Sequence, residues 1–190
     1  MVYSDSSMDS LAADEEEEGH NVRHMYVSRL DSEPEWDVDS YDGREYESDP
    51  EVRELFSDDE EYQEYSRSKR EAFESKGFVC DPLSRNYPIK DEHMEILVVS
   101  ENVTVRQLMT DLANLCVKKF NEEKGKTVEL VEIVRVIVTG GGTRKAYITF
   151  MARESLNGPL VEYQAKVVTY AGNWKPPFPI FCRPTPKPSI

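Results

Sequence analysis

Residues 104–150 decide the fold, and they read TVRQLMTDLANLCVKKFNEEKGKTVELVEIVRVIVTGGGTRKAYITF. Thr104 followed by Gln107 forms a Thr-x-x-Gln capping box, which is typical of a helix N-terminus. Apolar side chains then recur at the spacing of one helix face: Val105, Leu108, Met109, Leu112, Ala113, Cys116 and Phe120. Gly125 follows this stripe, and glycine readily adopts the left-handed conformation that ends a helix. The stretch predicts one long helix from Thr104 to about Gly125.

The sequence after this helix predicts a hairpin of two strands. Residues 128–138 contain too many β-branched side chains to continue the helix. Gly140, Gly141 and Gly142 can supply the positive φ angles of a turn, and residues 144–152 return as the partner strand. A helix followed directly by antiparallel strands restricts the architecture to a sheet packed on that helix.

Three further strands are expected outside this unit, at about residues 93–99, 160–170 and 178–182. The last is flanked by Pro177 and Pro184, which have no N–H to donate and therefore favour an edge position. The sequence predicts an α+β fold in which an antiparallel sheet of about four to five strands wraps over one long helix.

The helix and strand motifs resemble those of the plant cystatins and their divergent cystatin-related proteins. Residues 112–121 read LANLCVKKFN and occupy the frame of the cystatin helix pattern, which Leu112, Ala113, Val117, Phe120 and Asn121 match. Two strand segments, VEIVRV at 131–136 and YQAKVV at 163–168, are also similar to the family. The ending PFPIFCRP at 177–184 resembles the cystatin-related proteins more than the inhibitors. The resemblance implies a cystatin-like domain over residues 92–190.

Charge divides the chain into unlike parts. Residues 1–75 carry 25 acidic and seven basic side chains, against 12 and 16 in the rest, within a formal net charge of −14. Residues 1–57 lack a sustained apolar period, so we expect them to form a disordered acidic arm. Residues 58–91 are expected to form a short helix, stopped at Gly77, and an irregular linker in which Pro82 and Pro88 prevent strand pairing.

The composition argues against several partners and compartments. The folded part is only mildly basic and the arm is strongly acidic, so we expect no nucleic-acid binding. The sequence shows no signal peptide near Met1 and no run long enough to cross a membrane. We therefore expect a monomer in the cytoplasm or nucleus that does not associate with membranes.

No arrangement typical of an enzyme is present in the sequence. It contains no phosphate-binding loop, and His20, His24 and His93 are scattered. Three cysteines show no paired spacing, and Cys116 falls on the apolar helix stripe, where a core role is expected. We expect no catalytic residues, no metal and no cofactor.

The resemblance implies where such a domain would contact a protease. Cystatins inhibit papain-like cysteine proteases through an N-terminal glycine, a hairpin reading Gln-x-Val-x-Gly and a second hairpin with Pro-Trp. The candidate contact residues here are Val138, Thr139, Gly140, Gly141, Gly142, Trp174 and Pro176.

This candidate edge departs from the inhibitory pattern. The first hairpin lacks the Gln, its three glycines add freedom that docking must remove, and Trp174 follows Asn173 instead of a proline. Three functions remain open: a protein-binding module that has lost inhibition, a weak inhibitor of papain-like proteases, or a regulatory or transcription-associated adaptor acting through the acidic arm. Each implies another protein as partner.

Overall fold

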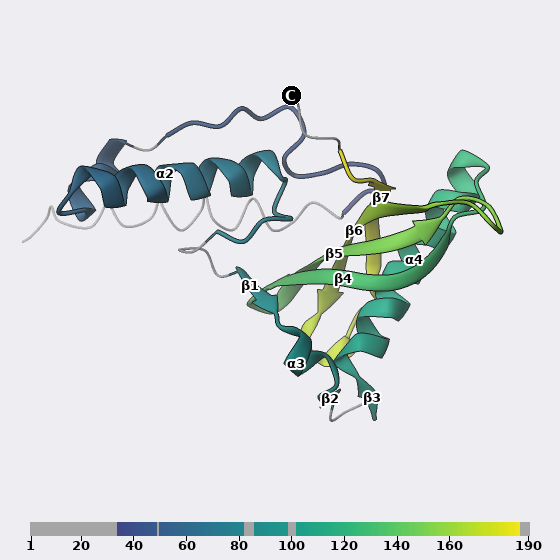
Figure 1. The fold of residues 1–190 in the computed structure, drawn as a ribbon. Helices are drawn as coiled ribbons and strands as arrows, with labels where there is room; N and C mark the ends of the chain where they lie inside the picture. Colours follow the sequence, from purple (N-terminus) through teal and green to yellow (C-terminus); the bar gives the residue numbers. More distant parts are fainter. Residues whose placement is uncertain (1–33, 49, 82–85, 99–101, 187–190) are drawn as a thin grey trace, which may run out of the picture. The chain divides into compact units, whose positions relative to one another are not determined.

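The computed structural model describes residues 34–48, 50–81, 86–98 and 102–186. Its elements in chain order are η1 (Pro50–Leu55), α2 (Asp59–Glu74), β1 (Asn86–Ile89), α3 (Asp91–Met94), β2 (Leu97–Val98), β3 (Val103–Thr104), α4 (Val105–Lys124), β4 (Glu129–Thr139), β5 (Thr143–Arg153), β6 (Leu160–Tyr170), η2 (Ala171–Asn173) and β7 (Phe178–Pro184) (Figure 1). The predicted disorder of residues 1–33 lies outside the described residues.

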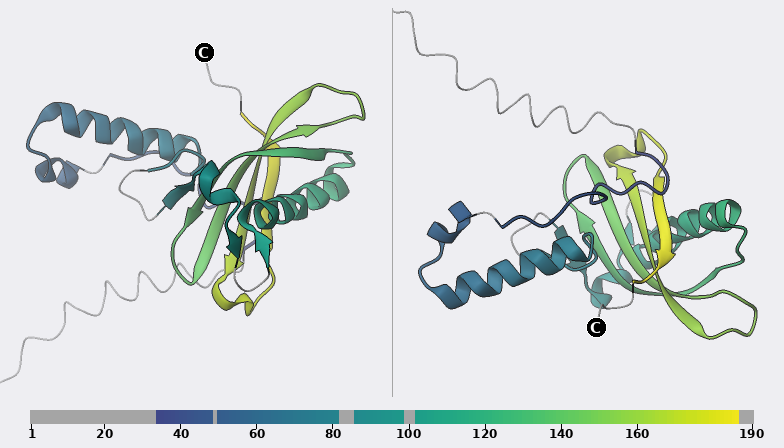
Figure 2. Two further views of the ribbon diagram at one scale, coloured as in Figure 1. Left: turned by 60° about the horizontal axis from the view of Figure 1, so that its bottom comes forward. Right: turned by 90° about the horizontal axis from the view of Figure 1, so that it is seen from above.

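One antiparallel sheet, with the strand order β1-β4-β5-β6-β7, forms the body of the fold. Helix α4 lies across one face of this sheet, as Figures 1 and 2 show. The predicted α+β class, with a sheet of five strands and one long helix packed on it, is confirmed. Strand β7 lies at an edge of the sheet, as its flanking prolines predicted.

The ends of α4 follow from the residues that flank it. Thr104 Oγ1 accepts a hydrogen bond from the Gln107 N–H at 3.1 Å, while the Gln107 side chain donates to Asp111 and leaves half of the predicted capping box unformed. Gly125 adopts the left-handed conformation, with φ 61° and ψ 38°. Asn121 then exchanges two hydrogen bonds with the backbone of Val128, at 2.8 and 2.9 Å, and fixes the turn into β4.

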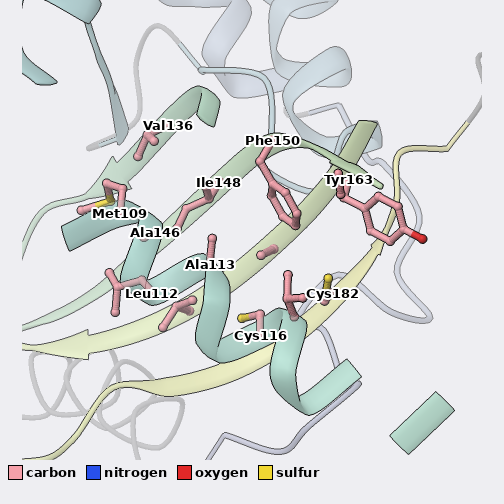
Figure 3. Close-up of a cluster of buried hydrophobic side chains, with 14 of the residues drawn as sticks. Met109, Leu112, Ala113, Cys116, Val136, Ala146, Ile148, Phe150, Tyr163 and Cys182 are labelled. Carbon is pink, nitrogen blue, oxygen red and sulfur yellow. The ribbon is translucent and has the colours of Figure 1, made fainter. Parts of the chain in front are cut away.

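The core lies between α4 and the inner face of the sheet (Figure 3). The predicted apolar stripe supplies Met109, Leu112, Ala113, Cys116 and Phe120, and all five are buried. Strands β5 and β6 contribute the facing side chains, among them Ala146, Ile148, Phe150, Tyr163, Ala165 and Val167. Val105 and Leu108 pack against the same cluster from its margin, so the predicted phase of the helix is confirmed.

The segment between Gly77 and α4 differs from its prediction. Residues 86–89 were expected to be irregular, but they form β1 and pair with β4, with Pro88 opposite Ile137. The proline is tolerated because β1 is an edge strand, whose outer side requires no N–H donors. The strand expected at about 93–99 is also wrong: Asp91–Met94 form a helical turn, and Leu97–Val98 pair with Val103–Thr104.

Helix α2 matches the helix expected after Asp58. The Asp58 carboxylate accepts a hydrogen bond from the Glu61 N–H at 2.8 Å, which caps the helix start. At its end the N–H of Lys76 donates to Phe73 and that of Gly77 to Ala72, at 2.8 and 2.9 Å, which is the Schellman pattern. Gly77 has φ 89°, and a Cβ there would lie 2.6 Å from the Tyr147 ring. Only glycine lets the chain pass so close to the sheet.

The acidic arm was predicted to extend to residue 57, but part of residues 34–48 packs on the folded domain. Residues 36–42, called the strap here, pack on the domain: Trp36 contacts the core cluster, and Asp39 is only 5% exposed. The strap runs across the outer face of the sheet, which α4 does not cover (Figure 2, right view). The composition of this segment predicted disorder, but the Asp39 carboxylate forms an ion pair with Lys166 on the sheet.

Candidate functional site

The β4–β5 hairpin ends in the predicted Gly-Gly-Gly tip. Among the three glycines only Gly141 has a positive φ, of 111°, so one residue of the predicted glycine turn adopts this conformation. A Cβ at Gly142 would meet nothing within 4 Å, and one at Gly141 would meet only the Thr143 carbonyl at 3.9 Å. The tip is therefore open, and close packing does not require glycine at these two positions.

The connection between β6 and β7 lies beside this tip. The Ala171 N–H donates to the Gly142 carbonyl at 2.8 Å, and Thr143 pairs with Tyr170 in the sheet. The start of β1 reaches the same end of the sheet, because Asn86 pairs with Thr139. We call these three neighbouring pieces, namely Asn86, residues 139–143 and residues 170–176, the loop edge.

Trp174 is the most prominent side chain of the loop edge, with 64% of its surface exposed. Its ring packs edge-on against Tyr170, with the centroids 5.0 Å apart. The Lys175 ammonium lies 5.1 Å from the Trp174 ring centroid and 5.7 Å from that of Tyr170, within range of a cation–π interaction. These contacts hold an exposed indole in a defined position.

The predicted contact residues divide into two groups in the structure. Val138 packs against the core, and Thr139 Oγ1 accepts a hydrogen bond from the Lys145 N–H at 2.8 Å, so these two residues stabilise the hairpin. The three glycines, Trp174 and Pro176 are exposed at the loop edge.

Sequence reasoning missed three residues that shape this edge. Arg144 donates to the Gly141 carbonyl at 3.2 Å and restrains the tip, while Tyr170 and Lys175 frame the indole. Alternation along β6 placed Tyr170 on the strand, but no local signal indicated that Trp174 would fold back onto it.

The cysteine thiols are poorly suited to nucleophilic chemistry. Burial raises the pKa of Cys116 well above its usual value and that of Cys182 to about 12. Burial, with the charge of Asp81, also raises the pKa of the half-buried Cys80. A reactive cysteine requires the opposite shift, toward the thiolate.

The described part of the chain shows no cluster of three or more His, Cys, Asp or Glu side chains that could hold a metal ion. Within the same residues, no helix combines the length and apolar character needed to cross a bilayer. The loop edge instead offers an aromatic pair, the basic side chain of Lys175 and open backbone, which are groups that contact other proteins.

Neither a protein-family model nor a curated protein matches this chain.

Proposed function

We propose that this chain is a protein-binding module, related to the plant cystatins, that contacts its partner through the loop edge. The observation that carries the proposal is Trp174. This side chain is 64% exposed, yet it is held in place by Tyr170 and Lys175. A positioned, exposed tryptophan is the side chain most enriched at the energetic centre of protein interfaces.

The arrangement of the loop edge supports a relation to inhibitors of papain-like proteases. The start of β1, the tip and the Trp174 connection meet at one end of the sheet. The resemblance to the cystatins implies that three such pieces together form the wedge that enters the protease cleft. This juxtaposition favours weak inhibition as the second candidate function.

The chemistry of the tip argues that inhibition is weak or lost. The position of the Gln of the inhibitory pattern is held by Val138, which packs into the core. Each of the two surplus glycines gives the free tip more conformational entropy, and the loss of that entropy on docking costs roughly 1 kcal/mol. Together with the lost side-chain contacts this amounts to a few kcal/mol, or roughly a hundredfold or more in affinity.

Replacing Trp174 with alanine should remove the interaction with the cellular partner. Truncation of a central interface tryptophan costs about 2 kcal/mol or more, which is roughly thirtyfold in affinity. Proximity labelling in cells should recover some proteins with the full-length wild type that it does not recover with W174A. The matched control is L156A, because Leu156 is 85% exposed in the β5–β6 turn, at the other end of the sheet. Equal recovery with W174A and wild type would contradict the proposal.

Titration of papain with the full-length chain should give an inhibition constant in roughly the micromolar range or no inhibition, given the deficit of a few kcal/mol. G140V is the informative variant, because it removes backbone freedom at a surplus glycine whose φ is not positive and restores the Val of the inhibitory pattern. It should strengthen any inhibition by up to about fivefold. Nanomolar inhibition by the wild type would show that the module is a functional inhibitor.

A further inference from the structure

The outer face of the sheet carries an unusual buried charge. Lys166 on β6 is 1% exposed, although its side chain points away from the core that α4 covers. Burial lowers the pKa of its ammonium to about 8, and the Asp39 carboxylate opposes this shift. Lys145 and Arg183 lie near enough to add repulsion. Three cations on neighbouring strands make this face a site for negative charge.

The strap supplies that negative charge through three aspartates, each of which pairs with a lysine. Asp37 pairs with Lys124 at 2.8 Å, Asp39 pairs with the buried Lys166, and Asp42 pairs with Lys76. Two aromatic side chains accompany these carboxylates. Trp36, just before Asp37, packs on the core cluster, and Tyr41, between Asp39 and Asp42, has its ring centroid 5.2 Å from the Lys166 ammonium. The strap is thus an acidic, aromatic peptide bound to a basic, aromatic face.

The strap is held mainly by side chains. Within the described residues, its backbone bonds to the sheet at one place, where the Asp37 N–H donates to the Ile180 carbonyl at 2.6 Å. The Asp42 N–H donates within the strap to the Asp39 carbonyl at 3.0 Å, and the N–H of Arg44, just beyond the strap, donates to the Tyr41 carbonyl at 3.2 Å. A segment attached in this way can be exchanged for another without breaking the sheet.

The face also retains polar groups that the strap does not satisfy. Thr149, Gln164 and Arg183 form one row across β5, β6 and β7, next to the row that contains Lys166. Thr149 is 1% exposed, and neither its hydroxyl nor the Arg183 Nε has a hydrogen-bond partner in the described part of the chain. One oxygen of Asp39 is likewise buried without a partner. A better-matched ligand would gain hydrogen bonds that the strap leaves unmade.

We propose that the outer face of the sheet is a binding site for an acidic, aromatic peptide segment of another protein, and that the strap occupies this site in cis until it is displaced. The incoming segment carries a carboxylate for Lys166 on this face, further carboxylates for Lys124 at the end of α4 and for Lys76 just after α2, and an aromatic ring in the place of Tyr41. Charge complementarity with this face selects the class of ligand.

The proposal predicts that weakening the strap opens the site to a peptide in trans. The probe is a labelled peptide of residues 34–48, and the proteins are the full-length wild type and D39N. In the wild type the strap competes at an effective concentration near millimolar, so the peptide should bind weakly. D39N should bind it at least about tenfold more tightly, and a peptide carrying D39N itself should lose that gain.

Strap release is measured independently by tryptophan fluorescence. In a W174F background the emission reports Trp36 alone, because the chain contains two tryptophans. Release should shift this emission to the red. If D39N holds its strap in place, the triple variant D37N/D39N/D42N removes all three ion pairs and the peptide comparison is made with it.

Four results would overturn the proposal. The first is equal binding of the native and D39N peptides by a chain whose strap is released. The second is failure of that released chain to bind the native peptide at all. The third is a wild-type dimer, detected by light scattering, that exchanges straps, which would assign the face to a second copy of this chain. Binding that persists in a D39N/K166M chain would place the peptide elsewhere and contradict the proposal too.

Discussion

Replacing Leu112 with alanine should lower the free energy of unfolding by about 2–5 kcal/mol, the range for emptying a leucine site in a packed core. Leu112 is 4% exposed and faces the sheet from the middle of α4 (Figure 3). Its neighbours Met109, Ala113 and Cys116 are fixed by the same helix, so they cannot move freely into the space left behind. Urea denaturation followed by circular dichroism measures the loss.

Asn114→Ala is the matched control for this prediction, because Asn114 is exposed two positions further along the same helix. The change should leave stability within about 0.5 kcal/mol, as is usual for surface positions. Equal effects of the two substitutions would contradict the assignment of Leu112 to the buried face of α4.

Replacing Lys166 with methionine should have the other large effect, a loss of about 3–5 kcal/mol, because it leaves the Asp39 carboxylate buried without its counter-charge. The side chains of this pair are only 1% and 3% exposed. The double variant K166M/D39L removes both charges and keeps similar volumes, so its stability should return to within about 1 kcal/mol of the wild type. Thermal and urea unfolding of the three proteins test this cycle.

Lys124→Met provides the control for the ion pair. Lys124 also pairs with an aspartate of the strap, but both side chains of this pair are about half exposed, at 48% and 49%. Exposed ion pairs contribute about 0–1 kcal/mol. A loss in K166M no greater than that in K124M would contradict the argument that the Lys166 pair is shielded from water.

The sequence predicted those parts of the fold that depend on neighbouring residues. Thr104 and Gly125 bound α4 through local backbone conformations, and the apolar stripe between them set the face that contacts the sheet. The β-branched run and the glycine tip likewise predicted the β4–β5 hairpin. All of these signals lie within a few residues of the structure that they specify.

The parts that were missed depend on distant partners. Pro88 predicted from its local sequence that no strand would form. The segment nevertheless pairs with β4 as an edge strand, where the missing N–H of Pro88 breaks no hydrogen bond of the sheet. Asp39 lies in a stretch whose composition predicted disorder, and its partner Lys166 is 127 residues away. Trp174 could be assigned to the loop edge from the resemblance, but its packing on Tyr170 could not.

The long separation between Asp39 and Lys166 also sets an order of events during synthesis of the chain. The strap leaves the ribosome well before β6 and β7, which form its seat, because Lys166 follows Asp39 by 127 residues. Closing a loop of this length costs entropy that is recovered only when the sheet is already in place. The strap must therefore remain undocked until β6 and β7 have been translated. Its aspartates keep it soluble during that wait, so one set of charges serves the nascent chain first and the finished domain afterwards.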